Sequence, residues 1–441
     1  MIQTIRKAWG VPELRKKIVF TLLILLIFRI GNAIPVPYIN TTLLGNYLDS
    51  MSGTVLGLYN VMSGGAFAEA TVFALGVQPY INSSIIIQLL TIAIPALERL
   101  ARDGGEAGKK KIASITRYAT VAIALLQGFG YYMICKNYNI LEQQGIWPAL
   151  VIIVSFVAGS SFVMWLGEQV NEFGVGNGIS IILFAGILSR VPNMVTMGAS
   201  YIRTKGSIGC LWIALLIVGM LAMVVLIVHV NEAERRIPVQ YAKRVVGRKM
   251  YGGQNTHIPI KVNMSGVMPI IFAGSILSIP PTIQMFVPSA KLADSKFWTG
   301  FFKVFTSTHW AYGIIYFILI IAFAYFYSSI QYNPIEMSQN IAKNGGMIPG
   351  IRTGRPTSDY IARIISRITL LGALLLSVVA IFPIVFSQLT TLILTKTTVY
   401  ADGMNVSLGG TSIIILVGVA LETVKQLESQ MMMRHYKGFL D

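Results

Sequence analysis

Few side chains in this sequence could catalyse a reaction, and the residue types and spacings favour an apolar site instead. The sequence has four histidines: His229, His257, His309 and His435. No two of them have the spacing of metal ligands, and neither Cys135 nor Cys210 belongs to a C-x-x-C motif. No Walker A motif is present. We therefore expect no catalytic residues, no metal, no cofactor and an energy source outside the chain.

Branched apolar residues form two pairs at helical spacing. Ile81 precedes Ile85 by four residues, and Ile179 precedes Leu183 by four, so each pair shares one face of a helix. Ordinary packing is the usual explanation for such pairs. The first pair, however, flanks the polar run Asn-Ser-Ser at 82–84. Apolar side chains in a wet path form a constriction that excludes water and ions by dewetting, and we favour that interpretation.

The glycine-rich run GVGNG at 174–178 leads into the second pair. Such a run before a helix can cradle an anion at the helix N-terminus. Three glycines also suit a tight turn into the helix, because glycine adopts the backbone angles that turns require. We favour the turn.

The first pair lies in the stretch 60–90, around which the rest of the chain is organised. This stretch begins with a Gly-rich, polar segment too broken to span a membrane and continues as a membrane-length helix with many polar side chains. Non-helical backbone at membrane depth survives only where protein buries it or where it lines a wet cavity. We predict that the stretch forms the wall of a polar path and holds a small folded element within it.

The composition indicates a polytopic membrane protein. The 441 residues are 54% hydrophobic and 12% charged, with a mean hydropathy of +0.66, whereas soluble domains are roughly 25% charged. The apolar run at 18–34 has no A-x-A site behind it, so we do not interpret it as a cleavable signal peptide. Ten segments are long enough to span a bilayer: 18–37, 71–94, 113–135, 148–168, 178–197, 210–229, 264–284, 311–331, 364–386 and 408–425. We predict an all-α fold of ten transmembrane helices.

Lysine and arginine are sorted by loop. They gather in both tails and in three of the loops on the same side, at 99–117, 231–262 and 332–363. The opposite loops carry only Lys136, Arg203, Lys205, Lys291, Lys296, Lys303 and Lys396. Because cytosolic loops are enriched in these cations, the alternation supports the count of ten spans and predicts that both termini are cytosolic.

Two of the basic loops, 231–262 and 332–363, are much longer than the roughly 2–8 residues that usually connect helices in a bundle. The first loop alternates at Ile237, Val239 and Tyr241, which is typical of a projecting hairpin. Passive connection is one explanation for these loops. Their length, basic charge and glycines favour a docking surface.

The chain divides by topology into two halves, 1–197 and 198–441. Each half would hold five spans, and the two would be inverted relative to one another, as is common in transport proteins. The spans lack acidic residues at their centres, which argues against a proton-driven carrier. Three classes remain beside a wide channel: a small-solute transporter, a membrane scaffold or insertase without a through-pore, and, least favoured, an intramembrane enzyme.

Seven motifs carry a resemblance to a known family: RIGNAIPVPYI at 29–39, MSGGAFAEATVFALGVQPYINSSIIIQLL at 62–90, GVGNGISIILFAG at 174–186, RRIPVQYAKR at 235–244, THIPIKVNMSGVMPIIFA at 256–273, NPIEMSQNIAKNGGMIPGIR at 333–352 and GGTSIIILVGVALET at 409–423. Together they resemble the SecY family, the channel subunits of the bacterial protein-conducting translocon. Two departures from the family pattern are Tyr38, where glycine is usual, and Thr353, where proline is usual. The resemblance implies a non-enzymatic channel that passes unfolded secretory polypeptides across the membrane and releases membrane helices sideways into lipid.

The resemblance also implies roles for particular residues around a central pore. The pore ring would be Ile81, Ile85, Ile179, Leu183, Ile271 and Ile415. The plug, at about 63–73, would include Ser63, Gly64, Gly65, Phe67 and Glu69. Polar positions of a lateral gate, formed by the second, third, seventh and eighth segments, would be Gln127 and Asn263. The docking surface for a motor or ribosome would include Lys243, Arg244 and Arg352.

The partners that this resemblance implies are the SecE and SecG subunits, the SecA motor, the ribosome, signal peptides, nascent chains and membrane lipids. Contact with nucleic acid is expected only through ribosomal RNA. The implied location is the bacterial cytoplasmic membrane, which the chain would cross many times.

Overall fold

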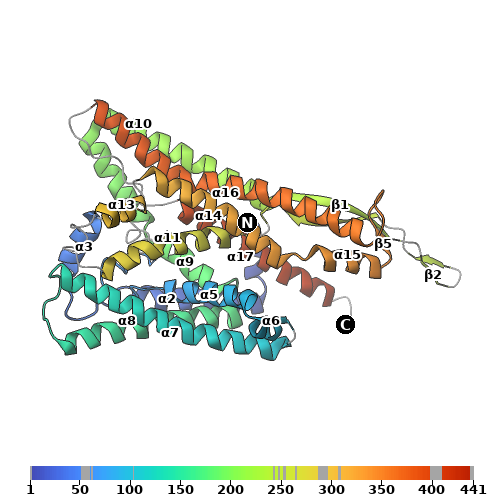
Figure 1. Cartoon of the computed structure of the whole chain (residues 1–441), viewed down its shortest axis with the longest axis horizontal. Coiled ribbons are helices and arrows are strands. Elements are labelled where there is room, and N and C mark those ends of the chain that lie inside the picture. Colours follow the sequence, from blue (N-terminus) through green and yellow to red (C-terminus); the bar gives the residue numbers. More distant parts are fainter. Residues whose placement is uncertain are drawn as a thin grey trace.

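The computed structural model describes residues 2–50, 60, 63–102, 104–241, 244–246, 249–251, 255–263, 266–286, 296–305, 309–397 and 410–437. Most of the described chain is helical, and the long helices lie side by side (Figure 1). The helices are α1 Ile2–Trp9, α2 Pro12–Gly31, α3 Thr41–Ser50, α5 Gln78–Ala93, α6 Pro95–Arg102, α7 Gly105–Asn137, α8 Ile146–Phe173, α9 Gly178–Leu188, α10 Val191–Glu232, α11 Met268–Phe286, α13 Lys296–Val304, α14 Trp310–Gln331, α15 Pro334–Lys343, α16 Arg355–Thr397 and α17 Gly410–Lys437. The strands are β1 Glu234–Tyr241, β2 Arg244–Val246, β3 Lys249–Tyr251, β4 Asn255–Lys261 and β5 Gly346–Met347.

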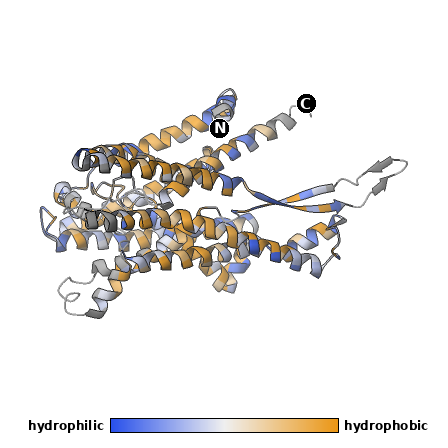
Figure 2. Cartoon of the chain, turned by 90° about the horizontal axis from the view of Figure 1, so that it is seen from above, coloured by the Kyte–Doolittle hydropathy of each residue, from blue (hydrophilic) through white to orange (hydrophobic). Residues whose placement is uncertain are grey.

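Each of the ten predicted segments contains a helix. Within the described residues, six helices are long and apolar enough to cross a membrane, or seven if the bent pair of α5 and α6 counts as one span. Large apolar side chains such as Leu125, Val218 and Val225 remain exposed on the outer faces of these helices. Figure 2 shows the helices as mainly hydrophobic, whereas hydrophilic residues gather on the strands that project from one end. Such outer faces suit a hydrocarbon environment, because a helix satisfies its own backbone hydrogen bonds.

The second predicted segment was expected to be helical from residue 71, and this is wrong. Thr71 forms a β-bridge with Pro35, residues 72–77 form turns, and the helix begins at Gln78. Pro79 lies in the first turn of that helix, where proline needs no N–H partner. Gly76 has a φ of +51°, which turns the chain into the helix. The helix then ends at Ala93, and α6 departs at 105°. The span is therefore shorter and more broken than its hydropathy indicated.

The fifth segment is also interrupted. Helix α9 ends at Leu188, and α10 begins at Val191 and continues through the predicted boundary between the halves at 197 and 198. The nearest break in helical geometry within α10 is Gly206, with φ +59° and ψ −136°. The division of the chain into two inverted halves stays a prediction.

The predicted hairpin in loop 231–262 is confirmed. Strands β1 and β4 pair antiparallel, with Ile237 opposite Ile258. The short strand β5, which belongs to loop 332–363, adds to the other edge of β1, with Gly346 opposite Tyr241. The two basic loops are thus joined in one sheet, which the sequence did not predict. We call β1, β4, β5, α15 and the first turns of α16 the sheet unit.

Tyr38 adopts a left-handed backbone conformation with a φ of +69°. Non-glycine residues seldom adopt it, because Cβ crowds the following carbonyl oxygen. The neighbouring contacts hold the backbone there: the N–H of Glu142 donates to the Tyr38 carbonyl oxygen at 3.1 Å, and Ile39 forms a β-bridge with Leu141. Tyr38, where the family usually has glycine, therefore adopts a conformation that glycine would adopt more readily.

Candidate functional site

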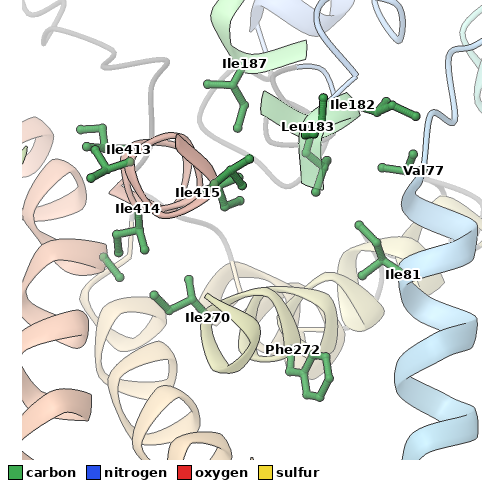
Figure 3. Packing of buried hydrophobic residues seen from close by; sticks show 14 of the residues in the cluster. Val77, Ile81, Ile182, Leu183, Ile187, Ile270, Phe272, Ile413, Ile414 and Ile415 are labelled. Carbon is green, nitrogen blue, oxygen red and sulfur yellow. The ribbon is translucent and has the colours of Figure 1, made fainter. Parts of the chain in front are cut away.

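The six residues predicted to form a ring lie on four helices: Ile81 and Ile85 on α5, Ile179 and Leu183 on α9, Ile271 on α11 and Ile415 on α17. All six belong to, or pack against, one large apolar cluster. Four of them expose at most 8% of their surface, and Ile179 and Ile271 are partly buried. Figure 3 shows Ile81, Leu183 and Ile415 pointing from three helices toward a common space. The structure thus brings together residues that are more than 300 positions apart in the sequence.

The turn before α9 sets the direction of two ring residues. The N–H of Gly178 donates to Asn171 Oδ1 at 2.8 Å, and the Asn177 side chain accepts from the N–H of Ser180 at 3.3 Å. Gly176 has a φ of +80°. These helix-start donors are engaged within the protein, so the interpretation as a tight turn fits better than an anion cradle. The Ile179 side chain packs against Gly167 of α8. A Cβ added to Gly167 would lie 2.5 Å from Cδ1 of Ile179.

Sequence reasoning missed several members of the same cluster. Val77 and Ile187 are buried: Ile187 follows Leu183 by four residues on α9, whereas Val77 is the N-cap residue of α5, four residues before Ile81. The helical period could therefore have extended the second pair to Ile187, whereas Val77 lies in the turns before α5. Ile270 is fully buried on α11. The helical period could not single it out, because it is adjacent to the predicted residue Ile271 and adjacent residues point to different sides of a helix. Within the described residues, no group of three or more His, Cys, Asp or Glu side chains could hold a metal ion.

The stretch that contains Ser83 was expected to line a polar path, but Ser83 does not do so. Its side chain is fully buried, and its hydroxyl lies 2.6 Å from the hydroxyl of Thr120 on α7. The Thr120 hydroxyl also donates to the Thr116 carbonyl oxygen at 2.7 Å. A buried hydroxyl in an apolar bundle is costly unless it is hydrogen-bonded, so this pair fastens α5 to α7. Asn82 and Ser84 are partly exposed and remain candidates for the path.

The predicted plug is a compact, largely buried set of turns. Ser63 and Phe67 are 5% exposed, Gly64 and Gly65 are partly exposed, and Glu69 is exposed. The Asn32 side chain donates to the Ser63 carbonyl oxygen at 3.2 Å. The hydroxyl of Tyr131 donates to the Phe67 carbonyl oxygen at 2.7 Å.

Two further contacts place this segment beside the ring. A Cβ on Gly64 would lie 2.9 Å from the Ser189 hydroxyl and 3.1 Å from Gly186 at the end of α9. Phe73, later in the same segment, belongs to the apolar cluster of the ring residues. The segment 63–73 therefore packs on helix α9, which carries two ring residues, and on their cluster.

The two predicted gate residues have different surroundings. Gln127 is half-buried on α7, which packs against α11. Asn263 is buried, and its amide nitrogen donates to Asn231 Oδ1 near the end of α10 at 2.6 Å. The donor of Asn263 is thus directed to α10, not to α7.

The predicted docking residues belong to the two basic loops. Arg352 is exposed, three residues before α16. Arg244 begins β2 and pairs with Tyr251. Lys243 lies outside the described residues. Only Arg352 can therefore be placed with its side chain.

Comparisons with known proteins cover nearly the whole chain. The sequence model of the SecY family matches residues 71–424. The protein translocase subunit SecY of Streptomyces galbus is 41% identical over 457 residues, with 100% of both chains covered. The corresponding subunit of Halalkalibacterium halodurans is 42% identical, again with 100% of both chains covered.

Solved structures agree in fold. A protein-conducting channel is 16% identical with a TM-score of 0.56, and 96% of each chain is covered. A structure of Sec61 in a canine ribosome-channel complex is 14% identical with a TM-score of 0.54, also with 96% of each chain covered. The family match and the full-length relatives decide the assignment: this chain belongs to the SecY family of protein translocase subunits.

Proposed function

We propose that this chain is the protein-conducting channel of a translocase in a bacterial cytoplasmic membrane. It passes unfolded secretory polypeptides across the membrane and releases membrane-protein helices sideways into lipid. As a member of a family of translocase subunits, it is not an enzyme, and a motor such as SecA or a translating ribosome drives the movement. SecE and SecG complete the channel, signal peptides and nascent chains enter it, and both of its termini are cytosolic.

The observation that carries this proposal is the apolar cluster in which residues of four helices, proposed to form the ring, come together. An extended polypeptide needs a wide path without strong binding sites. A ring of flexible apolar side chains deforms around any residue and closes again behind it, whereas charged residues would bind particular sequences and let ions pass. The ring residues belong to, or pack against, one apolar cluster, and such a lining disfavours water and ions by dewetting.

The other candidate residues take complementary roles. The segment 63–73 is the plug, which packs beside the ring and moves aside when a polypeptide enters. Gln127 and Asn263 lie near the lateral gate, where α7 meets α11. Lys243, Arg244 and Arg352 dock the motor or ribosome. An exposed arginine can bind a carboxylate or phosphate by two parallel hydrogen bonds, which suits acidic protein surfaces and ribosomal RNA.

Site-specific crosslinking tests the channel directly. Cys135 and Cys210 are replaced, a single cysteine is introduced at Ile81 or Ile271, and a secretory polypeptide with its own cysteine is arrested during export. We expect a disulfide adduct only when the polypeptide is arrested, because it must then pass the ring. The matched control is a cysteine at Ile86, which is 46% exposed on the same helix and faces outward.

The pattern of adducts separates the rival functions. If the arrested polypeptide reacts at Ile86 and never at the ring, the chain acts as an insertase without a through-pore. Saturable uptake of a small solute by the purified chain alone would favour a secondary transporter instead. Either result would remove the ring from the mechanism.

Reversing the charge of Arg352 tests the docking role. We expect Arg352→Glu to lower motor-dependent or ribosome-dependent export about tenfold, the equivalent of roughly 1.4 kcal/mol of lost binding. The cost in folding stability should stay below about 0.5 kcal/mol, because the side chain is exposed. Export is measured in proteoliposomes with matched amounts of channel.

The control for this variant is Lys136→Glu, which makes the same change of charge at the far end of α7, away from the sheet unit (Figure 1). It should export at the normal rate. Normal export by Arg352→Glu at normal abundance would contradict the docking assignment.

A further inference from the structure

The two basic loops share a hydrophobic core outside the helical bundle. It is formed by buried residues of β1, β4, α15, α16 and the segment between the last two: Ile237, Val239, Ile260, Ile341, Ile348, Ile361 and Ile365. Loops that share a buried core cannot move independently without exposing it to water. The sheet unit is therefore one folded body, with Arg352 on its surface.

Gly346 lies where the parts of the sheet unit meet most closely. A Cβ at this position would lie 2.9 Å from Tyr241 Cε1 and 3.1 Å from both Ile341 Cγ2 and Val239 Cγ1. The absence of a side chain lets β5 approach β1 and α15 together. This contact fixes the start of the segment 346–354, which contains Arg352.

The backbone carbonyl oxygens of Arg352 and Gly354 both accept hydrogen bonds from buried hydroxyls. The Thr357 hydroxyl donates to the Arg352 carbonyl oxygen at 2.8 Å, and the Ser338 hydroxyl donates to the Gly354 carbonyl oxygen at 2.9 Å. Thr357 and Ser338 are 2% and 4% exposed. Gly350 and Gly354 have φ values of +81° and +101°, which non-glycine residues rarely adopt. Because glycine is flexible, hydrogen bonds to its neighbours are needed to hold this turn in one conformation.

We propose that Thr357 is a positioning residue for docking: it acts through the backbone of Arg352 and holds that arginine in a binding-ready orientation on the sheet unit. This inference rests on the proposed docking function. A pre-organised arginine loses less conformational entropy when it binds a carboxylate or phosphate of the motor or ribosome. Because Thr357 itself is buried, it can act on a docked partner only through Arg352.

The test compares two substitutions of the same residue. Thr357→Val keeps the shape of the side chain and removes the hydroxyl, whereas Thr357→Ser keeps the hydroxyl. Transport into proteoliposomes is measured against the concentration of purified SecA. For Thr357→Val we expect the SecA concentration at half-maximal rate to rise about fivefold, with an unchanged maximal rate, because one hydrogen bond is lost. Thr357→Ser should behave as the unsubstituted protein does.

A double variant separates positioning from general destabilisation. If Thr357 acts through Arg352, then Thr357→Val combined with Arg352→Glu should dock no more weakly than Arg352→Glu alone. The inference would be overturned if the SecA concentration at half-maximal rate rose in the double variant by the product of the two single effects. An unchanged SecA requirement in Thr357→Val would overturn it as well. Should Thr357→Val fail to accumulate, Ser338→Ala removes the hydroxyl that bonds the Gly354 carbonyl oxygen, two residues further along the same turn, and should raise the SecA requirement in the same direction.

Failure of the inference is distinguishable from failure of the proposed function. If Arg352→Glu itself transports normally, the docking assignment falls and Thr357 has nothing to position. If Arg352→Glu is impaired and Thr357→Val is not, docking stands and only the positioning role is lost.

Discussion

Replacing Ile81 and Ile415 together by asparagine is expected to raise the resting ion conductance of the membrane-embedded protein about tenfold or more. Both side chains are buried in the apolar cluster of the ring, on α5 and α17, and point toward a common space (Figure 3). Amide side chains would hydrogen-bond water there and lower the barrier to ion passage, and each 1.4 kcal/mol removed from a barrier gives about tenfold in rate. Single-channel recording in planar bilayers measures the change.

The control for this variant is Ile86→Asn, which places the same amide on the outer face of α5. It should leave the conductance at its resting level. Buried asparagines can also weaken folding, so the double glycine variant of Ile81 and Ile415, which adds no polar side chain, is recorded alongside. Unchanged conductance in both ring variants would mean that the ion seal lies elsewhere.

Substituting Gly159 by alanine is expected to destabilise the protein by about 3 kcal/mol, at the upper end of what overpacking usually costs. A Cβ on Gly159 of α8 would lie 1.9 Å from the Val72 carbonyl oxygen, so the backbone of the turn segment or of α8 must shift. The adjacent Ser160 hydroxyl donates to the Gly76 carbonyl oxygen at 3.2 Å and would be displaced with it. Thermal unfolding of the purified protein in detergent measures the loss.

Cys135 provides the signal for this measurement. Its thiol is fully buried in the second apolar cluster with Phe67, whereas Cys210 is exposed and would be replaced by serine beforehand. A thiol-reactive dye then reports unfolding of the core next to the plug. Gly128→Ala is the matched control, because a Cβ there would meet its neighbours at 3.6 Å or more. Equal melting temperatures for the two variants would contradict the close approach of α8 to Val72.

The two helical pairs of the proposed ring could be singled out because the evidence for them is local. Ile81 and Ile85 share a helix face by their spacing, and a buried face follows from their apolar character. The partners across the ring could not be deduced from the period alone, because Ile415 lies on α17, far away in the sequence. Family resemblance supplied those positions. The structure brings them into the same cluster, while their role as a seal stays a proposal.

The turns at 72–77 could not be predicted from hydropathy, because an apolar run has the same composition whether it is a helix or a buried irregular segment. The deciding interactions are non-local. The N–H of Val72 donates to the Ile34 carbonyl oxygen at 2.9 Å, and Pro35 and Thr71 form a β-bridge. Ser83 was misread for a related reason, since its partner Thr120 lies on another helix.

The pairing of β5 with β1 had no signal in the sequence at all. The strand is only two residues long, and its place depends on a glycine that lets three elements approach. Arg352 could be singled out as a basic residue in a long loop. The hydroxyls that support its backbone became visible only when α15 and α16 were folded against the sheet.

Helix α16 has a mechanical consequence for the molecule. It starts beside Arg352 and continues without interruption for 43 residues, roughly 65 Å at 1.5 Å per residue and about twice the thickness of the hydrocarbon core. Figure 1 shows it running from the sheet unit toward the opposite end of the molecule. A force applied to the chain at Arg352 would therefore be transmitted along this one helix to the far side of the molecule. Pro383 weakens this helix locally, because proline cannot donate the backbone hydrogen bond that a helix normally makes at that position.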